Sequence, residues 1–131
     1  MTLSQSSLIP VIAAFFGTTI SAFGVNAILR PAHALSMFEF DYPTSAPIKQ
    51  LVDYLMIIYG IRDIYIGIAI FSTTYYGHRK ALGWNLLGLA GTAFVDGVVC
   101  KMNGHGEWNH WSYAPMVAIL GCLSLGALDF A

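Results

Sequence analysis

Charged residues are scarce in this chain of 131 residues, because Asp, Glu, Lys and Arg together make up only 10% of it. A soluble domain usually carries about a quarter charged residues, whereas 56% of this chain is hydrophobic. The scarcity of charge excludes an ordinary soluble domain and indicates a protein that lies in a lipid bilayer. The net charge is −1, and no basic stripe occurs, which excludes nucleic acid as a partner.

Two further absences limit the kinds of chemistry that the chain can perform. The chain has only two cysteines, Cys100 and Cys122, and their expected difference in depth argues against a disulfide. No His-x-x-x-His pair and no compact set of ligands occurs, so we expect no metal site. No motif for a nucleotide or another cofactor is present either. The sequence therefore predicts chemistry that depends on the chain's own side chains, with no cofactor.

Four apolar segments dominate the sequence, and each is near the roughly 20 residues that a helix needs to cross the hydrocarbon core. We expect one domain over residues 1–131 with an all-α fold, a four-transmembrane-helix bundle. The predicted spans are residues 8–29, 51–76, 81–99 and 110–128. No Lys or Arg precedes Arg30, so the first segment is a retained span and not a cleaved signal. We expect a multi-pass protein of the endoplasmic reticulum membrane if the source is eukaryotic.

The connecting segments are expected to separate the two faces of the membrane. Because consecutive spans run in opposite directions, the loops at 30–50 and 102–109 share one side. Both termini then lie on the other side, together with the short turn at 78–80. Lys and Arg are nearly balanced between the two sides, so the positive-inside rule leaves the orientation open.

Ionisable residues inside the predicted spans are the chain's most informative feature. Arg62 and Asp63 lie near the middle of the second span, and Asp96 lies in the last turns of the third. A charge at the bilayer centre costs at least ~2.5–3.5 kcal/mol, so such residues are candidates for function by default. Adjacent helical residues point about 100° apart, so Arg62 and Asp63 each need a further partner. Asp96 is the predicted partner. The alternative to a functional role is that these charges form an ion pair that only stabilises the packing of the helices.

Three other polar residues are expected near this group. Tyr59 shares a helix face with Arg62 and Asp63, because it precedes them by three and four residues. Asn26 lies near the end of the first span, on the same side of the membrane. His110 opens the fourth span and is a candidate proton carrier at the mouth of a cavity.

An arginine between two carboxylates is a potential acid–base device. The guanidinium keeps one carboxylate ionised, while desolvation or mutual repulsion keeps the other protonated. The first takes a proton from water and the second gives one to a leaving oxygen, which suits the opening of an epoxide by water. The predicted catalytic residues are Asp63, Arg62 and Asp96. The predicted substrate- or water-binding residues are Asn26, Tyr59 and His110.

The sequence also resembles a known family. The features concerned are the short four-span chain, Gly-Ile-Arg-Asp at residues 60–63, Asp96 late in the third span and a histidine at the start of the fourth. They resemble the small integral-membrane proteins of fungal secondary-metabolite clusters, a domain of unknown function. Some members are assigned as epoxide hydrolases of polyene polyketide pathways, such as those of aurovertin and citreoviridin. The resemblance covers nearly the whole chain and implies Arg62, Asp63 and Asp96 as the reactive set, with an apolar, membrane-partitioned substrate.

Three functions follow as hypotheses. The first is a membrane-embedded epoxide hydrolase that acts on a lipophilic natural product, a polyketide or a terpenoid. The second is an epoxide-opening cyclase or isomerase, in which an internal hydroxyl replaces water. The third is a non-catalytic membrane subunit or small-molecule carrier. The expected partners are the lipid bilayer and a lipophilic small molecule, and homo-oligomerisation is left open.

Overall fold

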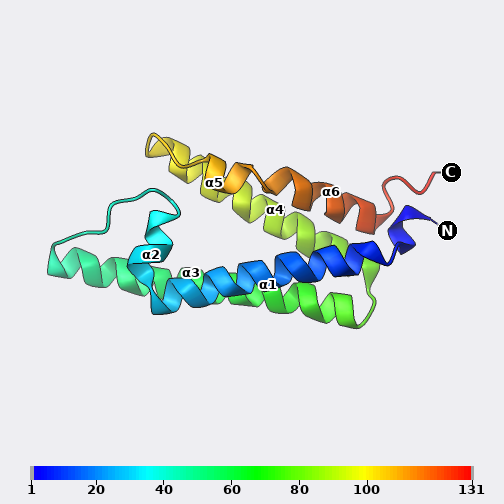
Figure 1. The fold of residues 1–131 in the computed structure, drawn as a ribbon, viewed down its shortest axis with the longest axis horizontal. Helices are drawn as coiled ribbons and strands as arrows, with labels where there is room; N and C mark the ends of the chain where they lie inside the picture. Colours follow the sequence, from blue (N-terminus) through cyan, green and yellow to red (C-terminus); the bar gives the residue numbers. More distant parts are fainter. Residues whose placement is uncertain (1, 131) are drawn as a thin grey trace.

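The computed structural model describes residues 2–130, and its regular structure there is entirely helical (Figure 1). The elements are η1 (Leu3–Gln5), α1 (Leu8–Leu29), α2 (Pro31–Ser36), α3 (Ala46–Tyr75), α4 (Arg79–Met102), α5 (Trp108–Trp111) and α6 (Ala114–Leu125). The prediction of an all-α fold is confirmed. Helices α1, α3 and α4 are long and apolar enough to cross a membrane, which indicates a multi-pass membrane protein.

The first three predicted spans correspond to these long helices. Helix α1 has the predicted bounds, and α4 extends a few residues past each end of 81–99. Helix α3 starts at Ala46 instead of residue 51, with Pro47 in its first turn. Proline is favoured there because its missing N–H would have no partner within the helix.

The fourth predicted span needs a correction, because residues 110–128 do not form one helix. Helix α5 ends at Trp111, and α6 begins at Ala114 with Pro115 in its first turn. In an uninterrupted helix the Pro115 ring would clash with the carbonyl of Trp111, four residues earlier. Helix α6 ends at Leu125, where Gly126 adopts a left-handed cap with φ 89°. Its 12 residues span about 18 Å at ~1.5 Å per residue, which is shorter than a hydrocarbon core.

The long helices form two antiparallel pairs, α1 with α3 and α4 with α6. Glycines allow the close approach in each pair. A Cβ on Gly24 or on Gly60 would lie 2.5 Å from the other residue's carbonyl oxygen, and Gly83 faces Gly121 in the second pair in a similar way. Small residues at such contacts are typical of helices that pack within membranes.

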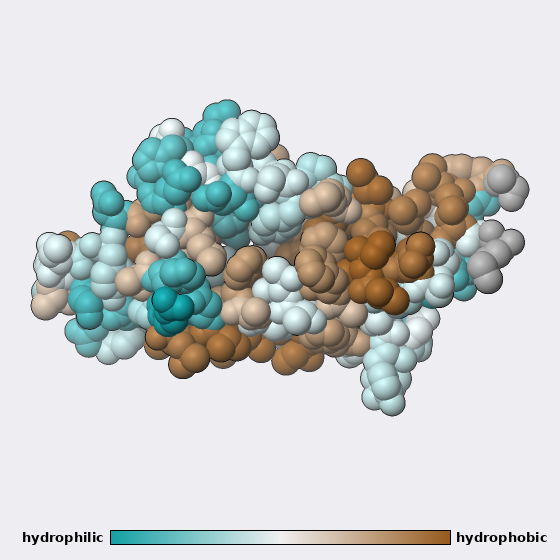
Figure 2. Space-filling view, in the orientation of Figure 1, coloured by the Kyte–Doolittle hydropathy of each residue, from teal (hydrophilic) through white to brown (hydrophobic). Residues whose placement is uncertain are grey.

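The two pairs diverge toward one end of the molecule, where α2 lies between them (Figure 1). The loop after α2 and the loop before α5 are at this end, and both termini lie at the opposite end with the turn between α3 and α4. This is the arrangement that alternating spans predict. Hydrophilic residues gather over the end that carries α2 and α5, and hydrophobic residues cover much of the other half (Figure 2).

Candidate functional site

A charged cluster joins α3 to α4 inside the bundle. The Arg62 guanidinium donates from Nη2 to Oδ2 of Asp96 (2.9 Å) and from Nη1 to Oδ1 (3.3 Å). This two-pronged contact is the geometry in which guanidinium and carboxylate fit best. The predicted pairing of Arg62 with Asp96 is confirmed.

Asp63 is the deepest member of this cluster. Its side chain has 0% exposure, and its Oδ1 accepts a hydrogen bond of 3.0 Å from Arg62 Nε. Asp63 lies on the buried face of α3 together with Gly60 and Gly67, the two glycines that contact α1. Within residues 2–130 its Oδ2 has no hydrogen-bond partner. A buried polar atom without a partner is rare, because desolvation of such an atom is unfavourable.

The Tyr59 ring lies between the charged cluster and a cavity. The guanidinium carbon of Arg62 is 4.3 Å from the centroid of this ring, a favourable cation–π distance. Phe38 meets the same ring edge-on, with the two centroids 5.3 Å apart. Tyr59 is thus the wall that the cluster and the cavity share.

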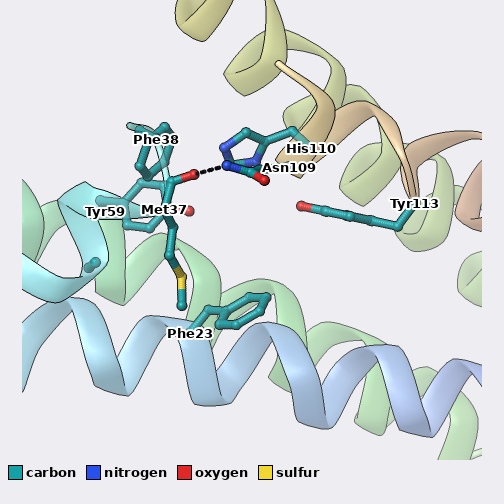
Figure 3. A pocket seen from close by; sticks show the side chains of 8 residues that line it. Phe23, Met37, Phe38, Tyr59, Asn109, His110 and Tyr113 are labelled. Atoms are coloured by element: carbon teal, nitrogen blue, oxygen red, sulfur yellow. Dashed lines mark hydrogen bonds between the residues drawn. The ribbon is translucent and has the colours of Figure 1, made fainter. Parts of the chain in front are cut away.

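The cavity has a volume of about 240 Å³ and lies where α1, α2, α3 and α5 come together (Figure 3). It is lined by Phe23, Ala34, Met37, Phe38, Tyr59, Asn109, His110 and Tyr113. Of the residues predicted for the site, Tyr59 and His110 are therefore in its wall. Arg62, Asp63 and Asp96 do not line it, although Arg62 packs against the Tyr59 ring.

His110 presents an unusual group to this cavity. Its side chain is only 6% exposed, and neither ring nitrogen has a hydrogen-bond partner in the described part of the chain. Its ring stacks at a tilt on Phe38, with the centroids 4.7 Å apart. The Tyr113 hydroxyl points into the cavity on the same side as His110 and Asn109 (Figure 3). Three polar side chains, those of His110, Tyr113 and Asn109, thus lie in the wall of a mostly apolar cavity.

Asn26, which was predicted to bind substrate or water, pairs with a histidine of α2. Its Oδ1 lies 3.1 Å from Nδ1 of His33, in a hydrogen bond that ties the end of α1 to α2. The Nδ2 of Asn26 is buried and has no partner among residues 2–130. The structure therefore places Asn26 beside α2 and outside the cavity lining.

Polar contacts join the segment around α5 to the residues that follow α2. Asn109 donates from Nδ2 to the Met37 carbonyl (3.0 Å) and to Oε1 of Glu39 (3.3 Å). Nδ1 of His105 lies 3.0 Å from Oε2 of Glu39. Glu39 has a positive φ of 57°, a conformation that is uncommon outside glycine. These contacts fasten the loop before α5 onto the end of α2.

Sequence reasoning missed most of this cavity. Met37 and Phe38 follow α2, a helix that was not predicted, and Tyr113 was not among the predicted site residues. Pro31 at the first position of α2 was the available signal, since proline often begins a helix. No set of three or more His, Cys, Asp or Glu that could hold a metal occurs within the described range.

Comparison with known proteins bears on these features. Residues 17–124 match the family described as "Domain of unknown function (DUF4267)", and this segment is more than half of the chain. The chain belongs to the DUF4267 family. Neither the curated proteins nor the solved structures give a match.

The DUF4267 segment contains the whole candidate site. It runs from the middle of α1 to the last turn of α6, so it includes the charged cluster, Tyr59 and His110. Membership confirms the resemblance to a domain of unknown function and assigns no activity by itself. The activity has to be argued from the site.

Proposed function

We propose that this DUF4267 protein is a membrane-embedded epoxide hydrolase that acts on a lipophilic natural product, a polyketide or a terpenoid. The observation that carries the proposal is the free Oδ2 of Asp63, fully buried in a cluster with Arg62 and Asp96. A cluster of this composition can hold a proton and accept another without a metal or an organic cofactor.

The charge balance of the cluster supports different protonation states for Asp63 and Asp96. One guanidinium cannot neutralise two carboxylates, and a net charge buried in the bilayer is costly. Both oxygens of Asp96 accept from Arg62, which favours its ionised form. Asp63 has an oxygen free of hydrogen bonds and is the member that holds the proton.

In the proposed reaction these two states act together. The Asp96 carboxylate takes a proton from a water molecule as the water oxygen attacks an epoxide carbon. The carbon–oxygen bond of the ring breaks, and Asp63 gives its proton to the ring oxygen, so that a diol forms. Asp96 then carries a proton and Asp63 does not, and exchange with water restores the starting state. Arg62 stays charged throughout.

The substrate reaches the cluster past Tyr59 in this proposal. Asp63 has no exposed surface, while Asp96 is 14% exposed and Arg62 is 36% exposed. Tyr59 lines the cavity and stacks on Arg62, so a turn of its side chain would join the two spaces.

We also propose that α5 and α6 together supply the fourth crossing. Residues 108–125 extend over about 27 Å at ~1.5 Å per residue, close to the thickness of a hydrocarbon core. Tyr113 in the turn between α5 and α6 faces the cavity, and irregular backbone at membrane depth is tolerated where it lines a cavity. The bundle would then keep the predicted four segments with one of them broken.

A second function, the opening of an epoxide by a hydroxyl of the same molecule, is favoured by the cavity walls. Phe23, Ala34, Met37 and Phe38 are apolar and make up half of the lining. An apolar wall excludes bulk water, which an internal hydroxyl does not need. The acid and the base would keep their roles.

Product mass distinguishes the two reactions. Purified protein in phospholipid nanodiscs is incubated with a long-chain epoxide that carries a hydroxyl group close enough to the epoxide to close a ring, and the product is analysed by mass spectrometry. Hydrolysis gives a product heavier by one water, and cyclisation gives a product of unchanged mass. Recovery of the intact epoxide from protein that is folded by circular dichroism would contradict both enzyme functions.

An Asp63→Asn variant separates catalysis from a structural role. The amide has nearly the same shape, and its oxygen can still accept from Arg62 Nε, so the protein should fold and lose turnover. Asp53→Asn is the control on the same helix, since Asp53 pairs with Tyr42 and Lys49 outside the cluster. A non-catalytic subunit predicts the opposite, namely that the Asp63 variant fails to fold or assemble.

A further inference from the structure

A second hollow lies on the membrane-facing surface, between α1 and α6. It is a groove of about 490 Å³ with almost entirely apolar walls, among them Ile12, Phe15, Phe16 and Met116. Phe15 is 66% exposed, so the groove is open to the surroundings of the helices. In a bilayer these surroundings are lipid chains.

The groove and the cavity are neighbours that share part of their walls. Phe23, Asn109 and Tyr113 line both of them. In Figure 3, Phe23 lies on α1 below the cavity and Tyr113 precedes α6 beside it. The apolar groove therefore leads to the place where the polar atoms of His110 and Tyr113 converge.

The unpartnered ring of His110 indicates what kind of molecule fits this combined site. A plain hydrocarbon chain in the cavity would leave both ring nitrogens of His110 without a hydrogen bond. A molecule with one hydroxyl, carbonyl or ether oxygen would provide the missing partner, and burial makes that partner important. The groove in turn is suited to a chain without polar groups.

We propose that the cavity and the groove form one binding site for an amphipathic molecule that enters sideways from the lipid. Its oxygen-bearing end lies beside His110 and Tyr113, and its hydrocarbon chain lies along the groove between α1 and α6. The inference rests on the proposed function, for which it defines the substrate class and the route of entry. An epoxide on such a chain arrives at the Tyr59 wall of the cavity.

The dimensions of the two hollows agree with this class of ligand. Small-molecule sites are typically about 300–1,000 Å³, mostly apolar, with a few convergent polar groups. The cavity of about 240 Å³ alone is below this range, and together with the groove of about 490 Å³ it falls within it. A ligand confined to the cavity would have to be small, whereas a chain in the groove need not be.

The test uses a pair of photoreactive probes that differ only in one oxygen. The first is a long-chain alcohol with a diazirine in its chain, and the second is the corresponding alkane. Each is added to the full chain in nanodiscs, irradiated, and the labelled residues are found by mass spectrometry. The alcohol should label α1 and α6 residues of the groove, and the alkane should label them more weakly by roughly three- to tenfold, the factor that one hydrogen bond supplies.

Two variants with a matched control locate the site. Thr19 lines the groove and Thr18 does not, yet each hydroxyl bonds the carbonyl four residues earlier at 2.9 Å. Thr19→Trp should fill the groove and abolish labelling by the alcohol, and Thr18→Trp should leave it unchanged. His110→Phe keeps an aromatic ring on Phe38 but removes the nitrogens, so the alcohol should label this variant as weakly as the alkane does.

The epoxide assay on the same variants keeps this inference distinct from the proposed function. Turnover that is lost in Thr19→Trp and kept in Thr18→Trp supports both the proposed hydrolase and the proposed binding site. Equal turnover by the two variants would be compatible with the proposed hydrolase but would contradict the proposed binding site. Equal labelling by alcohol and alkane would also overturn it, because the groove would then hold ordinary lipid chains.

Discussion

Arg62 and Asp96 meet through both terminal nitrogens of the guanidinium, at 2.9 and 3.3 Å, although they belong to different helix pairs. Asn85 of α4 makes a second polar link to α3, through the Ala69 carbonyl at 3.1 Å. The pairs are therefore held together by hydrogen bonds in a region where lipid offers none. The same guanidinium also donates from Nε to Oδ1 of Asp63 at 3.0 Å, so it contacts both carboxylates of the cluster.

Replacing Arg62 by lysine should separate the effect of the positive charge from the effect of the two-pronged contact with Asp96. Lysine keeps the positive charge but cannot bind both Asp96 oxygens in a planar fork. We expect Arg62→Lys to fold and to lose turnover of a long-chain epoxide by at least about 10²-fold, the lower range of a positioned acid–base group. Steady-state kinetics alongside circular dichroism checks this expectation. Wild-type turnover in the lysine variant would show that the fork has no part in the reaction.

The close approach of α1 and α3 gives a prediction about stability. In Gly24→Ala the new Cβ would lie 2.5 Å from the Gly60 carbonyl oxygen, so the helices must separate. Overpacking of this kind typically costs about 1–3 kcal/mol. Gly91→Ala is the control, because nothing lies within 4 Å of its added Cβ and alanine favours a helix by roughly 0.5–1 kcal/mol.

Denaturant titration in mild detergent would measure both glycine variants. A lower midpoint for Gly24→Ala, together with an equal or higher one for Gly91→Ala, is the expected pattern. If the two variants lose stability equally, the interface between α1 and α3 is not the tight contact described above.

Acid should release the two ends of the chain from each other. Ser4 donates its backbone N–H to Oδ1 of Asp129 at 3.0 Å. Hydrogen bonds from Ser4 hold the pKa of Asp129 below its usual value. A lowered folded-state pKa stabilises the contact above the ordinary pKa of about 3.9, and this contribution is lost as the pH falls through the lowered value. Spin labels at Thr2 and Phe130 should therefore move apart in strong acid.

Asp129→Asn provides the comparison for this pH effect. An amide has no proton to gain in this range, so the acid-induced step in the label distance should be missing. The same step in the variant would assign the effect to another group.

Much of the fold could be predicted because membrane spans have a strong signal in composition. Helix α1 was placed at residues 8–29 from apolar length alone. The approach of Arg62 to Asp96 followed from depth along the helices and from the need of a buried cation for a partner. Both inferences depend on the apolar interior of the bilayer, which requires long apolar helices and a partner for each buried charge in every spanning chain.

Local backbone chemistry was the part that hydrophobicity could not predict. Pro31, Pro47 and Pro115 all lie in the first turn of a helix, and each marks a start that an apolar profile does not show. Pro115 in particular explains the break between α5 and α6. The cavity depends on this break and on α2, so its walls could not be derived from the positions of the spans.

The packing of the Arg62 guanidinium on the Tyr59 ring was also beyond the sequence. Helical spacing put both residues on one face, but a spacing does not tell which side chain covers the other. Packing against Phe38 and Arg62 decides this, and Phe38 belongs to a segment with no periodic pattern. The roles of Asp63, Arg62 and Asp96 in a reaction stay predictions that an assay must test.

The most direct test follows an oxygen atom from water into the product. Wild-type protein and its Asp96→Asn variant are incubated with a long-chain alkyl epoxide in ¹⁸O-labelled water, and the folded fraction of each sample is measured alongside. We expect one labelled oxygen per diol from the wild type and a loss of at least about 10²-fold in the variant. An unlabelled product would contradict hydrolysis, and equal labelling by the two folded proteins would contradict catalysis by the Asp63–Arg62–Asp96 cluster.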